Sequence, residues 1–173
     1  MTDDVADFKT AVSRFPTGVT VIATSDGTNL AGMTANAIFS LSLSPPSVVV
    51  SLQNDAETTR LIGITRKGAV SFLSADQRHV SETFSRRNSQ AEKFRTVPWL
   101  KGNNGQPIIE GCISALEISV QNIVPAADHQ LVIANVTRVV NSGGRLPLIY
   151  YASSYATMEP DGKLVLPQGR RNY

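Results

Sequence analysis

The chain has 173 residues, of which 42% are hydrophobic and 17% are charged, and its formal net charge at pH 7 is +2. This balance excludes an intrinsically disordered chain and predicts a single globular domain over residues 1–173. Because basic and acidic residues nearly cancel, we expect neither a nucleic-acid partner nor binding to an anionic membrane surface.

Apolar runs, the first ten residues and the cysteine count indicate where in the cell the protein is expected and whether it is expected to contain disulfides. No apolar run approaches the roughly 20 residues that cross a bilayer, and the acidic start "MTDDVADFKT" lacks the order of a secretory signal. Cys112 is the single cysteine, so no disulfide framework is expected within the chain. We therefore expect a soluble cytoplasmic protein without a membrane partner.

The first third of the chain predicts a short helix followed by antiparallel strands. The apolar residues of "DDVADFKTAVSRF" fall near one helical face, and Pro16 ends the pattern. Strands are expected over residues 19–24, 30–41 and 47–53, with a turn at 25–27 and a break at Pro45 and Pro46.

The middle of the chain mixes helices with short strands. The segment "DAETTRLIGITRKG" predicts a helix closed by Gly68, "AVSFL" a buried strand, and "ADQRHVSETF" a second helix with Asp76 as its candidate cap. Residues 85–107 show no sustained period and carry five basic residues but one acid. We expect a long loop there, of the kind that usually has a function.

The last third predicts long strands. In "CISALEISVQNIV" the residues Leu116, Ile118 and Val120 share a face opposite Glu117. The segments "HQLVIANVTRVV" and "PLIYYASSY" predict a long and a short strand, and residues 156–173 a terminal hairpin or tail. Many strands without a βαβ rhythm favour a mainly β fold, a small closed or partly closed barrel with a few helices.

Two of these strands, "VTVIAT" and "SVVVSL", are apolar on both faces. One face can line a barrel, whereas the other needs a helix or a second subunit to cover it. The simplest expectation is a homodimer.

Familiar catalytic motifs are missing from the sequence. It contains no G-x-G-x-x-G, Walker loop, G-x-S-x-G, H-E-x-x-H or C-x-x-C, and its two histidines, His79 and His129, lie far apart. We therefore expect no metal site. The small polar residues Thr34 and Asn36 leave room for a flat heterocycle to approach the backbone, although they are also typical of a solvent-facing strand.

Seven segments, taken in order and spacing, resemble the short-chain flavin reductases, the reductase components of two-component flavin-dependent monooxygenases. They are "FKTAVSRFPTGVTVIAT", "GMTANAIFSLSLSPPSVVVSL", "AVSFLSADQRHVSETFS", "EKF", "PIIEGCISALEISV", "DHQLVIANV" and "PLIYYASSY". The resemblance covers a core of about residues 8–155. It implies a flavin reductase-like split β-barrel with Greek-key strands, assembled as a homodimer.

The implied activity is the transfer of a hydride from NADH to FAD or FMN. Reduced flavin then diffuses to a separate flavin-dependent monooxygenase. Because the two cofactors carry the chemistry, no catalytic side chain is obligatory. The preference for FAD over FMN and for NADH over NADPH rests on the resemblance alone.

The resemblance also implies the residues that bind the cofactors. Thr34, Ala35 and Asn36 match the segment along the isoalloxazine ring, with Ser40 on the neighbouring polar side. The ribityl chain and phosphates are assigned to Ser51, Leu52, Gln53, Ser85, Arg86 and Lys93. NADH is assigned to His129, Tyr151, Pro16 and Thr17.

Three of these assignments have alternatives. Arg86 and Lys93 also fit a solvated basic loop, and His129 also fits a strand-edge histidine bonded to backbone. Ala127 stands where relatives have the glycine of a G-D-H motif, so we expect the turn before His129 to differ in shape. Arg87 and Arg95 receive no role, and Phe94 and Trp99 are expected to pack under the loop.

Two other functions compete with a reductase. A flavin-binding module without turnover would not need His129 or the loop at 85–105. A pyridoxamine-phosphate-oxidase-like flavoprotein would need a denser basic phosphate pocket than the scattered arginines provide.

Overall fold

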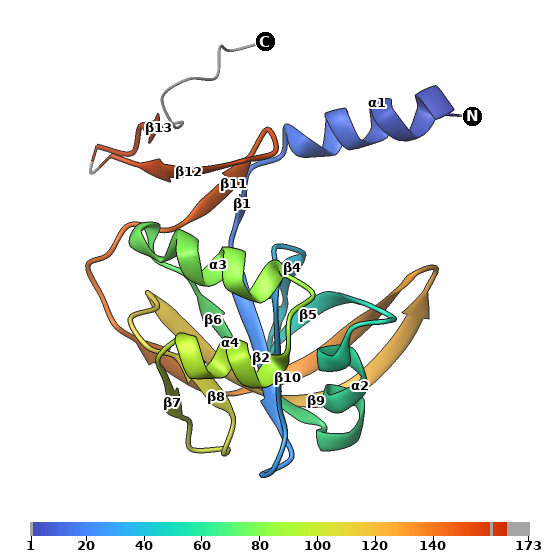
Figure 1. Ribbon diagram of the computed structural model, residues 1–173, viewed down its shortest axis with the longest axis vertical. Coiled ribbons are helices and arrows are strands. Elements are labelled where there is room, and N and C mark those ends of the chain that lie inside the picture. Colours follow the sequence, from blue (N-terminus) through green and yellow to red (C-terminus); the bar gives the residue numbers. More distant parts are fainter. Residues whose placement is uncertain (1, 160, 166–173) are drawn as a thin grey trace.

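The computed structural model describes residues 2–159 and 161–165 (Figure 1). Its helices are α1 (Thr2–Ser13), α2 (Glu57–Thr65), α3 (Arg78–Ser85) and α4 (Gln90–Thr96), with a 3₁₀ turn η1 (Ala75–Gln77). Its strands are β1 (Thr17–Gly18), β2 (Thr20–Ser25), β3 (Leu30–Ala35), β4 (Ile38–Leu43), β5 (Pro46–Gln53), β6 (Lys67–Phe72), β7 (Trp99–Lys101), β8 (Pro107–Ile109), β9 (Ser114–Ala126), β10 (His129–Asn141), β11 (Ile149–Tyr151), β12 (Ser154–Met158) and β13 (Leu164–Val165). Among the described residues, no helix has the length and apolar character needed to cross a membrane.

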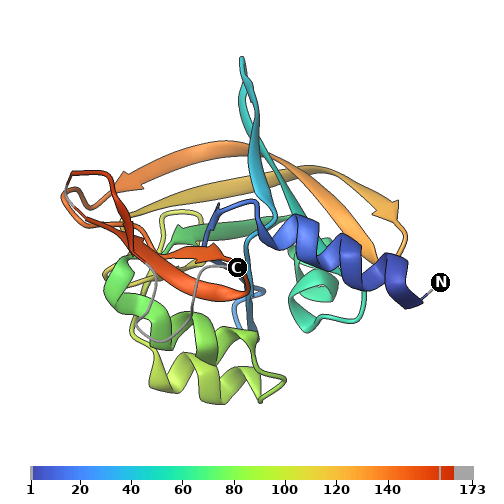
Figure 2. The same cartoon turned by 90° about the horizontal axis from the view of Figure 1, so that it is seen from above.

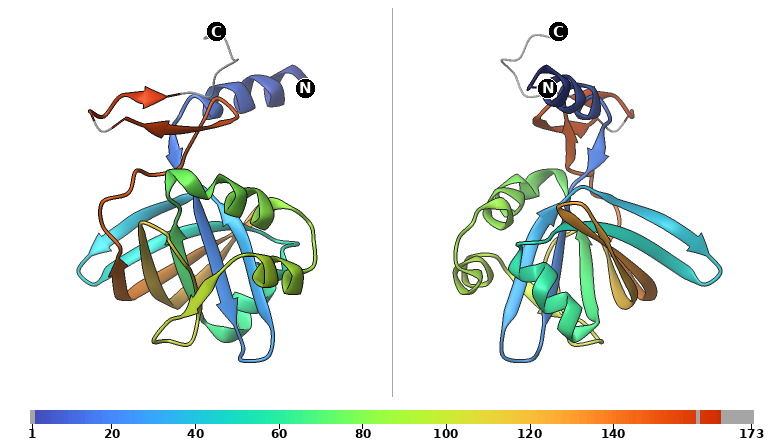
Figure 3. Two further views of the ribbon diagram at one scale, coloured as in Figure 1. Left: turned by 60° about the vertical axis from the view of Figure 1, so that its left-hand side comes forward. Right: turned by 90° about the vertical axis from the view of Figure 1, so that its right-hand side faces the viewer.

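A seven-stranded antiparallel sheet in the order β3-β2-β6-β9-β10-β5-β4 forms the body of the molecule. It curls into a barrel that stays open between its two edge strands, β3 and β4 (Figure 3). The predicted split β-barrel is therefore confirmed in its partly closed form.

The two edge strands are consecutive in the chain. Residues 36–37 cross from one edge of the sheet to the other, and the N–H of Ser51 donates to the carbonyl oxygen of Ala37 at 2.9 Å. The single strand predicted over 30–41 is thus wrong. The alternating pattern continues across the break, so the sequence gives no sign that its halves pair with different neighbours.

The barrel interior and its outer wall form two apolar cores. Ile22, Leu52 and Ile118 belong to the interior core. On the other side of β2, Val21 packs in a second core with Phe84 of α3 and other residues of α3, α4 and the strands. The second apolar face of β2 is therefore covered by helices of the same chain (Figure 1), which was the alternative to a second subunit.

Residues 85–107 are folded, so the long loop predicted there is wrong. They contain α4 and the β7–β8 hairpin. Phe94 packs edge to face on Phe84 at 5.1 Å and on Trp99 at 6.0 Å between ring centroids, which confirms that these aromatic residues pack. The helix has only seven residues and few apolar ones, too short a pattern for periodicity to detect.

Both predicted helix ends lie elsewhere. Arg66, with φ of 53°, ends α2, whereas Gly68 lies in β6, where an added Cβ would come within 3.1 Å of Ile62. Ser74, not Asp76, caps η1, through a reciprocal pair of bonds with Gln77. In both cases the predicted residue lies only two positions from the true end.

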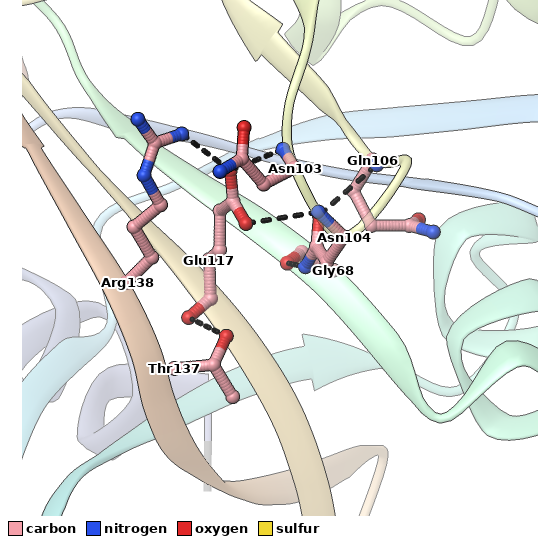
Figure 4. Close-up of polar contacts among 7 residues, drawn as sticks. All are labelled: Gly68, Asn103, Asn104, Gln106, Glu117, Thr137 and Arg138. Carbon is pink, nitrogen blue, oxygen red and sulfur yellow. Dashed lines mark hydrogen bonds and ion pairs between the residues drawn. The ribbon is translucent and has the colours of Figure 1, made fainter.

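On the side of β9 that was predicted to be polar, the side chain of Glu117 is buried. Glu117 is 1% exposed, and its carboxylate accepts hydrogen bonds from the backbone N–H groups of Asn103 at 2.7 Å and Asn104 at 3.0 Å (Figure 4). Arg138 on β10 lies 3.3 Å from the same carboxylate. The buried charge thereby fastens the turn of the β7–β8 hairpin to the barrel.

A small second sheet, β1-β11-β12-β13, lies beside the barrel with α1 next to it (Figure 1). The segment "PLIYYASSY" forms parts of two strands, because Ala152 and Ser153 both adopt positive φ and turn the chain. The predicted terminal hairpin is present as β12 and β13, while residues 160 and 166–173 lie outside the described part of the chain.

Candidate functional site

A pocket of about 540 Å³ opens where β3 ends and α2 begins. Four segments line it: Met33 to Ala37; Ser51, Gln53 and Asp55 to Thr58; Phe84 to Asn88 with Gln90 and Lys93; and His129. The volume lies within the range of small-molecule and cofactor sites.

The backbone of β3 forms one wall. The N–H of Gly32 donates to Oε1 of Gln90 at 2.9 Å, so at this position the backbone points away from β2. In an antiparallel edge strand every second residue points its N–H and C=O the same way. Thr34 therefore presents both groups on the side where Gln90 lies, while its hydroxyl donates to the carbonyl oxygen of Ser81 at 2.6 Å. Its backbone, rather than its hydroxyl hydrogen, is what remains for a ligand.

The start of α2 forms a second wall with unsatisfied polar groups. The N-cap residue Ala56 offers no side-chain bond to the first turn. Thr58 in that turn is fully buried, and among the described residues its Oγ1 has no hydrogen-bond partner. Free N–H groups and the helix dipole favour an anion at such an end. An orphaned hydroxyl in the same wall fits a phosphate oxygen as its partner.

Acidic and basic side chains meet around this helix end. Lys93 is only 4% exposed, and its Nζ lies 3.4 Å from one carbonyl oxygen, that of Phe84. Burial lowers the pKa of Lys93, while the charge of Glu57 acts to raise it. Glu57 by itself opposes a bound anion, so the buried ammonium is needed to offset it.

Two arginines lie at the mouth of the pocket, and they differ in whether an acidic side chain already pairs with them. Arg87, which was assigned no role from the sequence, lies 3.2 Å from the carboxylate of Asp55, and both side chains are exposed. Within the described ranges Arg86 makes no ion pair of its own. Arg86 is therefore the cation at the mouth that a ligand phosphate can engage.

His129 enters the pocket from the start of β10. Its Nδ1 lies 2.8 Å from Oδ1 of Asp128, and this hydrogen bond lowers the pKa of the Asp128 carboxyl below its ordinary value. Because a carboxylate only accepts, Nδ1 carries the hydrogen, and Nε2 has no hydrogen-bond partner within the part of the chain that the structure describes. Ala127 has φ of 52°, the left-handed conformation that glycine adopts most easily.

The pocket gathers most of the residues assigned from the sequence. Nine of them line it: Thr34, Ala35, Asn36, Ser51, Gln53, Ser85, Arg86, Lys93 and His129. Five do not: Ser40, Leu52, Pro16, Thr17 and Tyr151.

Four of the five residues outside the pocket have identifiable surroundings. The side chain of Leu52 is fully buried in the barrel core, and Ser40 lies on β4 opposite Val48. Thr17 and Tyr151 belong to the paired strands β1 and β11. Thr17 is linked to the pocket by the amide of Asn36, which donates to its Oγ1 at 3.2 Å.

Several pocket residues were missed by sequence reasoning, namely Met33, Ala37, Asp55, Ala56, Glu57, Thr58, Phe84, Arg87, Asn88 and Gln90. One signal was available for Thr58, because "NDAETT" begins a helix with alanine where a capping side chain is usual. Gln90 gave no signal, since its role depends on contact with Gly32 far away in the sequence.

Comparison with known proteins identifies the family and supports the fold. The family model for the flavin reductase like domain matches residues 12–159. An NADH-dependent flavin reductase of Rhodococcus sp is 35% identical over 156 residues, spanning 88% of this chain and 86% of that protein. The solved structure of the Streptomyces globisporus C-1027 NADH:FAD oxidoreductase, in complex with NAD and FAD fragments, is similar with a TM-score of 0.87 and 29% identity, covering 93% of this chain and 96% of that one.

A third relative is a component of a monooxygenase system. The styrene monooxygenase flavin reductase of Pseudomonas putida S12 has a TM-score of 0.81 and 30% identity, covering 88% of this chain and 97% of that one. With a family match over most of its length, the chain belongs to the flavin reductase-like domain family.

Proposed function

We propose that this protein is an NADH-dependent flavin reductase, and that it supplies reduced FAD or FMN to a separate flavin-dependent monooxygenase. Relatives named as NADH-dependent flavin reductases, one of them from a styrene monooxygenase system, support the reaction and the partner. The observation that carries the proposal is the pocket, which joins a backbone edge at Thr34 to an unsatisfied hydroxyl at Thr58.

The residues present fit a flavin. The backbone groups of Thr34 and Asn36 can meet the carbonyl and nitrogen edge of a flat ring, and the small side chain of Ala35 between them lets the ring approach, while the backbone of Ala35 faces β2. The first turn of α2, with Thr58, suits a phosphate, and Arg86 and Lys93 supply the positive charge. Ser51 and Gln53 lie between these two regions and are assigned to the ribityl chain.

The nicotinamide is assigned to the side of the pocket where His129 lies. Its free Nε2 offers one hydrogen-bonding position, fixed by the contact between Nδ1 and Asp128. Tyr151, Pro16 and Thr17 are proposed to close this side, and the bond from Asn36 to Thr17 supports that placement.

Bound together, the two cofactors supply the redox chemistry: NADH gives up a hydride and becomes NAD⁺, and the flavin takes up the hydride and a proton. The protein binds and orients them and limits the access of water. No side chain has to form or break a bond, so we assign no catalytic residue.

The test is NADH oxidation by the purified protein with FAD, with FMN and without flavin. We expect turnover only when flavin is added, with reduced flavin released to an added flavin-dependent oxygenase. Tight flavin binding without NADH consumption would favour the flavin-binding module instead.

We further propose that the protein forms a homodimer, on surfaces other than those the sequence suggested. The β4–β5 hairpin projects from the barrel (Figure 2), and on it Phe39 is 58% and Leu43 is 89% exposed. The apolar residues of α1, Val5, Phe8 and Val12, are exposed as well. Apolar side chains gathered on two projecting elements are typical of protein interfaces.

The dimer can be tested by sedimentation velocity. We expect the mass of two chains, and a shift toward one chain when Phe39 and Leu43 are both replaced by Asp. A wild-type protein of single-chain mass would contradict it.

The cytoplasmic location stays a prediction.

A further inference from the structure

Asn54 holds the turn from which His129 enters the pocket. This residue directly follows β5, and its N–H donates to the carbonyl oxygen of Asp128 at 3.0 Å. Its side-chain Nδ2 donates to the carbonyl oxygen of Ala127 at 3.1 Å. One residue therefore binds two consecutive carbonyls of the β9–β10 turn.

These two bonds lie where the ladder between β5 and β10 ends. The last paired residues are Gln53 and His129. Beyond them Ala127 has positive φ, a conformation that costs an alanine energy and needs support from its surroundings. Asn54 provides that support from the neighbouring strand.

The position of this turn sets the position of the imidazole. Asp128, whose carbonyl Asn54 binds, uses its carboxylate to orient His129 through the 2.8 Å contact with Nδ1. A turn that moved by a fraction of an ångström would carry both the histidine and its orienting carboxylate with it. Small displacements of this kind reduce binding in a preorganised site.

We infer that Asn54 is a positioning residue for NADH, which acts by fixing the turn that carries Asp128 and His129. This inference rests on the proposed function, in which His129 contacts the nicotinamide. Asn54 itself does not line the pocket, so its effect must pass through the turn.

The test uses two variants of the full-length protein, Asn54→Ala and Asn54→Asp. Both remove the Nδ2 donor, and the second keeps the shape of the side chain. We expect the KM for NADH to rise about 3- to 10-fold, the range expected from one lost hydrogen bond, while kcat and the KM for FAD change less than about twofold. Asn141→Asp, at the far end of β10, is the matched control for the added charge and should leave all three constants unchanged.

The same substitutions are then made in a His129→Ala background. There we expect no further rise in the KM for NADH, because the group that Asn54 positions is gone. An unchanged KM for NADH in the single variants, an equal rise for NADH and FAD, or a full effect without His129 would each overturn the inference. If His129→Ala alone leaves the KM for NADH unchanged, the nicotinamide assignment fails first and this inference falls with it, whereas flavin-dependent NADH oxidation by the wild type would still stand.

Discussion

The hydroxyl of Thr34 donates to the carbonyl oxygen of Ser81 at 2.6 Å, which ties the end of β3 to α3. Thr34→Val keeps the shape of the side chain but removes this donor. We expect the free energy of unfolding to fall by about 1 kcal/mol, as for a typical intramolecular hydrogen bond, and FAD affinity to fall because the pocket wall loosens. Urea unfolding and FAD titration measure both effects. Thr34→Ser, which keeps the hydroxyl, should lose less, and a valine variant as stable as the wild type would show that the bond contributes nothing.

Gly32 lies where the strand and two aromatic rings meet. An added Cβ would lie 2.7 Å from Cε1 of Phe84 and 3.0 Å from Cζ of Phe94. Gly32→Ala should therefore lower the free energy of unfolding by about 1 to 3 kcal/mol through overpacking. Gly63→Ala is the control, because nothing lies within 4 Å of its added Cβ on α2, and it should stabilise the helix by up to about 1 kcal/mol. Chemical denaturation compares the two, and equal effects would contradict the packing.

Ala127 carries backbone strain that glycine would relieve. Its φ of 52° costs an alanine about 1 to 2 kcal/mol, of which the greater chain entropy of unfolded glycine cancels part. Ala127→Gly should raise the melting temperature by a few degrees, whereas Ala126→Gly, without positive φ, should lower it. A loss of stability in both variants would argue against the left-handed conformation at Ala127.

The buried charge of Lys93 lowers the free energy of unfolding of the flavin-free protein but favours the binding of an anionic ligand. Because burial lowers its pKa, the unfolded chain holds the proton more tightly, and the free energy of unfolding rises as pH increases from the lowered pKa toward the ordinary value of 10.5. Lys93→Met should therefore stabilise the flavin-free protein at neutral pH, with a difference from the wild type that shrinks toward alkaline pH.

The same substitution should weaken FAD binding about tenfold, the effect of losing about 1.4 kcal/mol of charge-assisted contact. Thermal unfolding at several pH values and FAD titration provide the two measurements. Lys101→Met, on exposed β7, should change neither. A Lys93→Met protein that is less stable yet binds FAD normally would mean that the ammonium has a structural role.

Local patterns in the sequence were enough to predict most strands of the large sheet and a partly closed barrel. The alternation of Leu116, Ile118 and Val120 and the apolar run of β5 correctly indicate buried strands. They could not predict that residues 30–41 divide between two edges of the sheet, because pairing partners are not encoded in periodicity. Nor could they show that Glu117 is buried, since a polar residue on an alternating strand usually faces solvent.

The site was predicted unevenly for a similar reason. Segments that resemble the family, such as Thr34 to Asn36, do line one pocket with Arg86, Lys93 and His129. Thr58 and Gln90 complete its walls through contacts between distant segments, and such contacts appear only in the folded chain.

The central claim is that a flavin phosphate binds at the start of α2, and FAD titration of Thr58→Val against Thr59→Val tests it most directly. Thr59 is the matched control, because its hydroxyl already donates to the carbonyl oxygen of Gln53 at 2.7 Å, whereas Oγ1 of Thr58 has no partner among the described residues. We predict that Thr58→Val raises the Kd for FAD about tenfold without loss of stability, and that Thr59→Val costs about 1 kcal/mol of stability with little change in Kd. An unchanged Kd in the Thr58→Val protein would contradict the account.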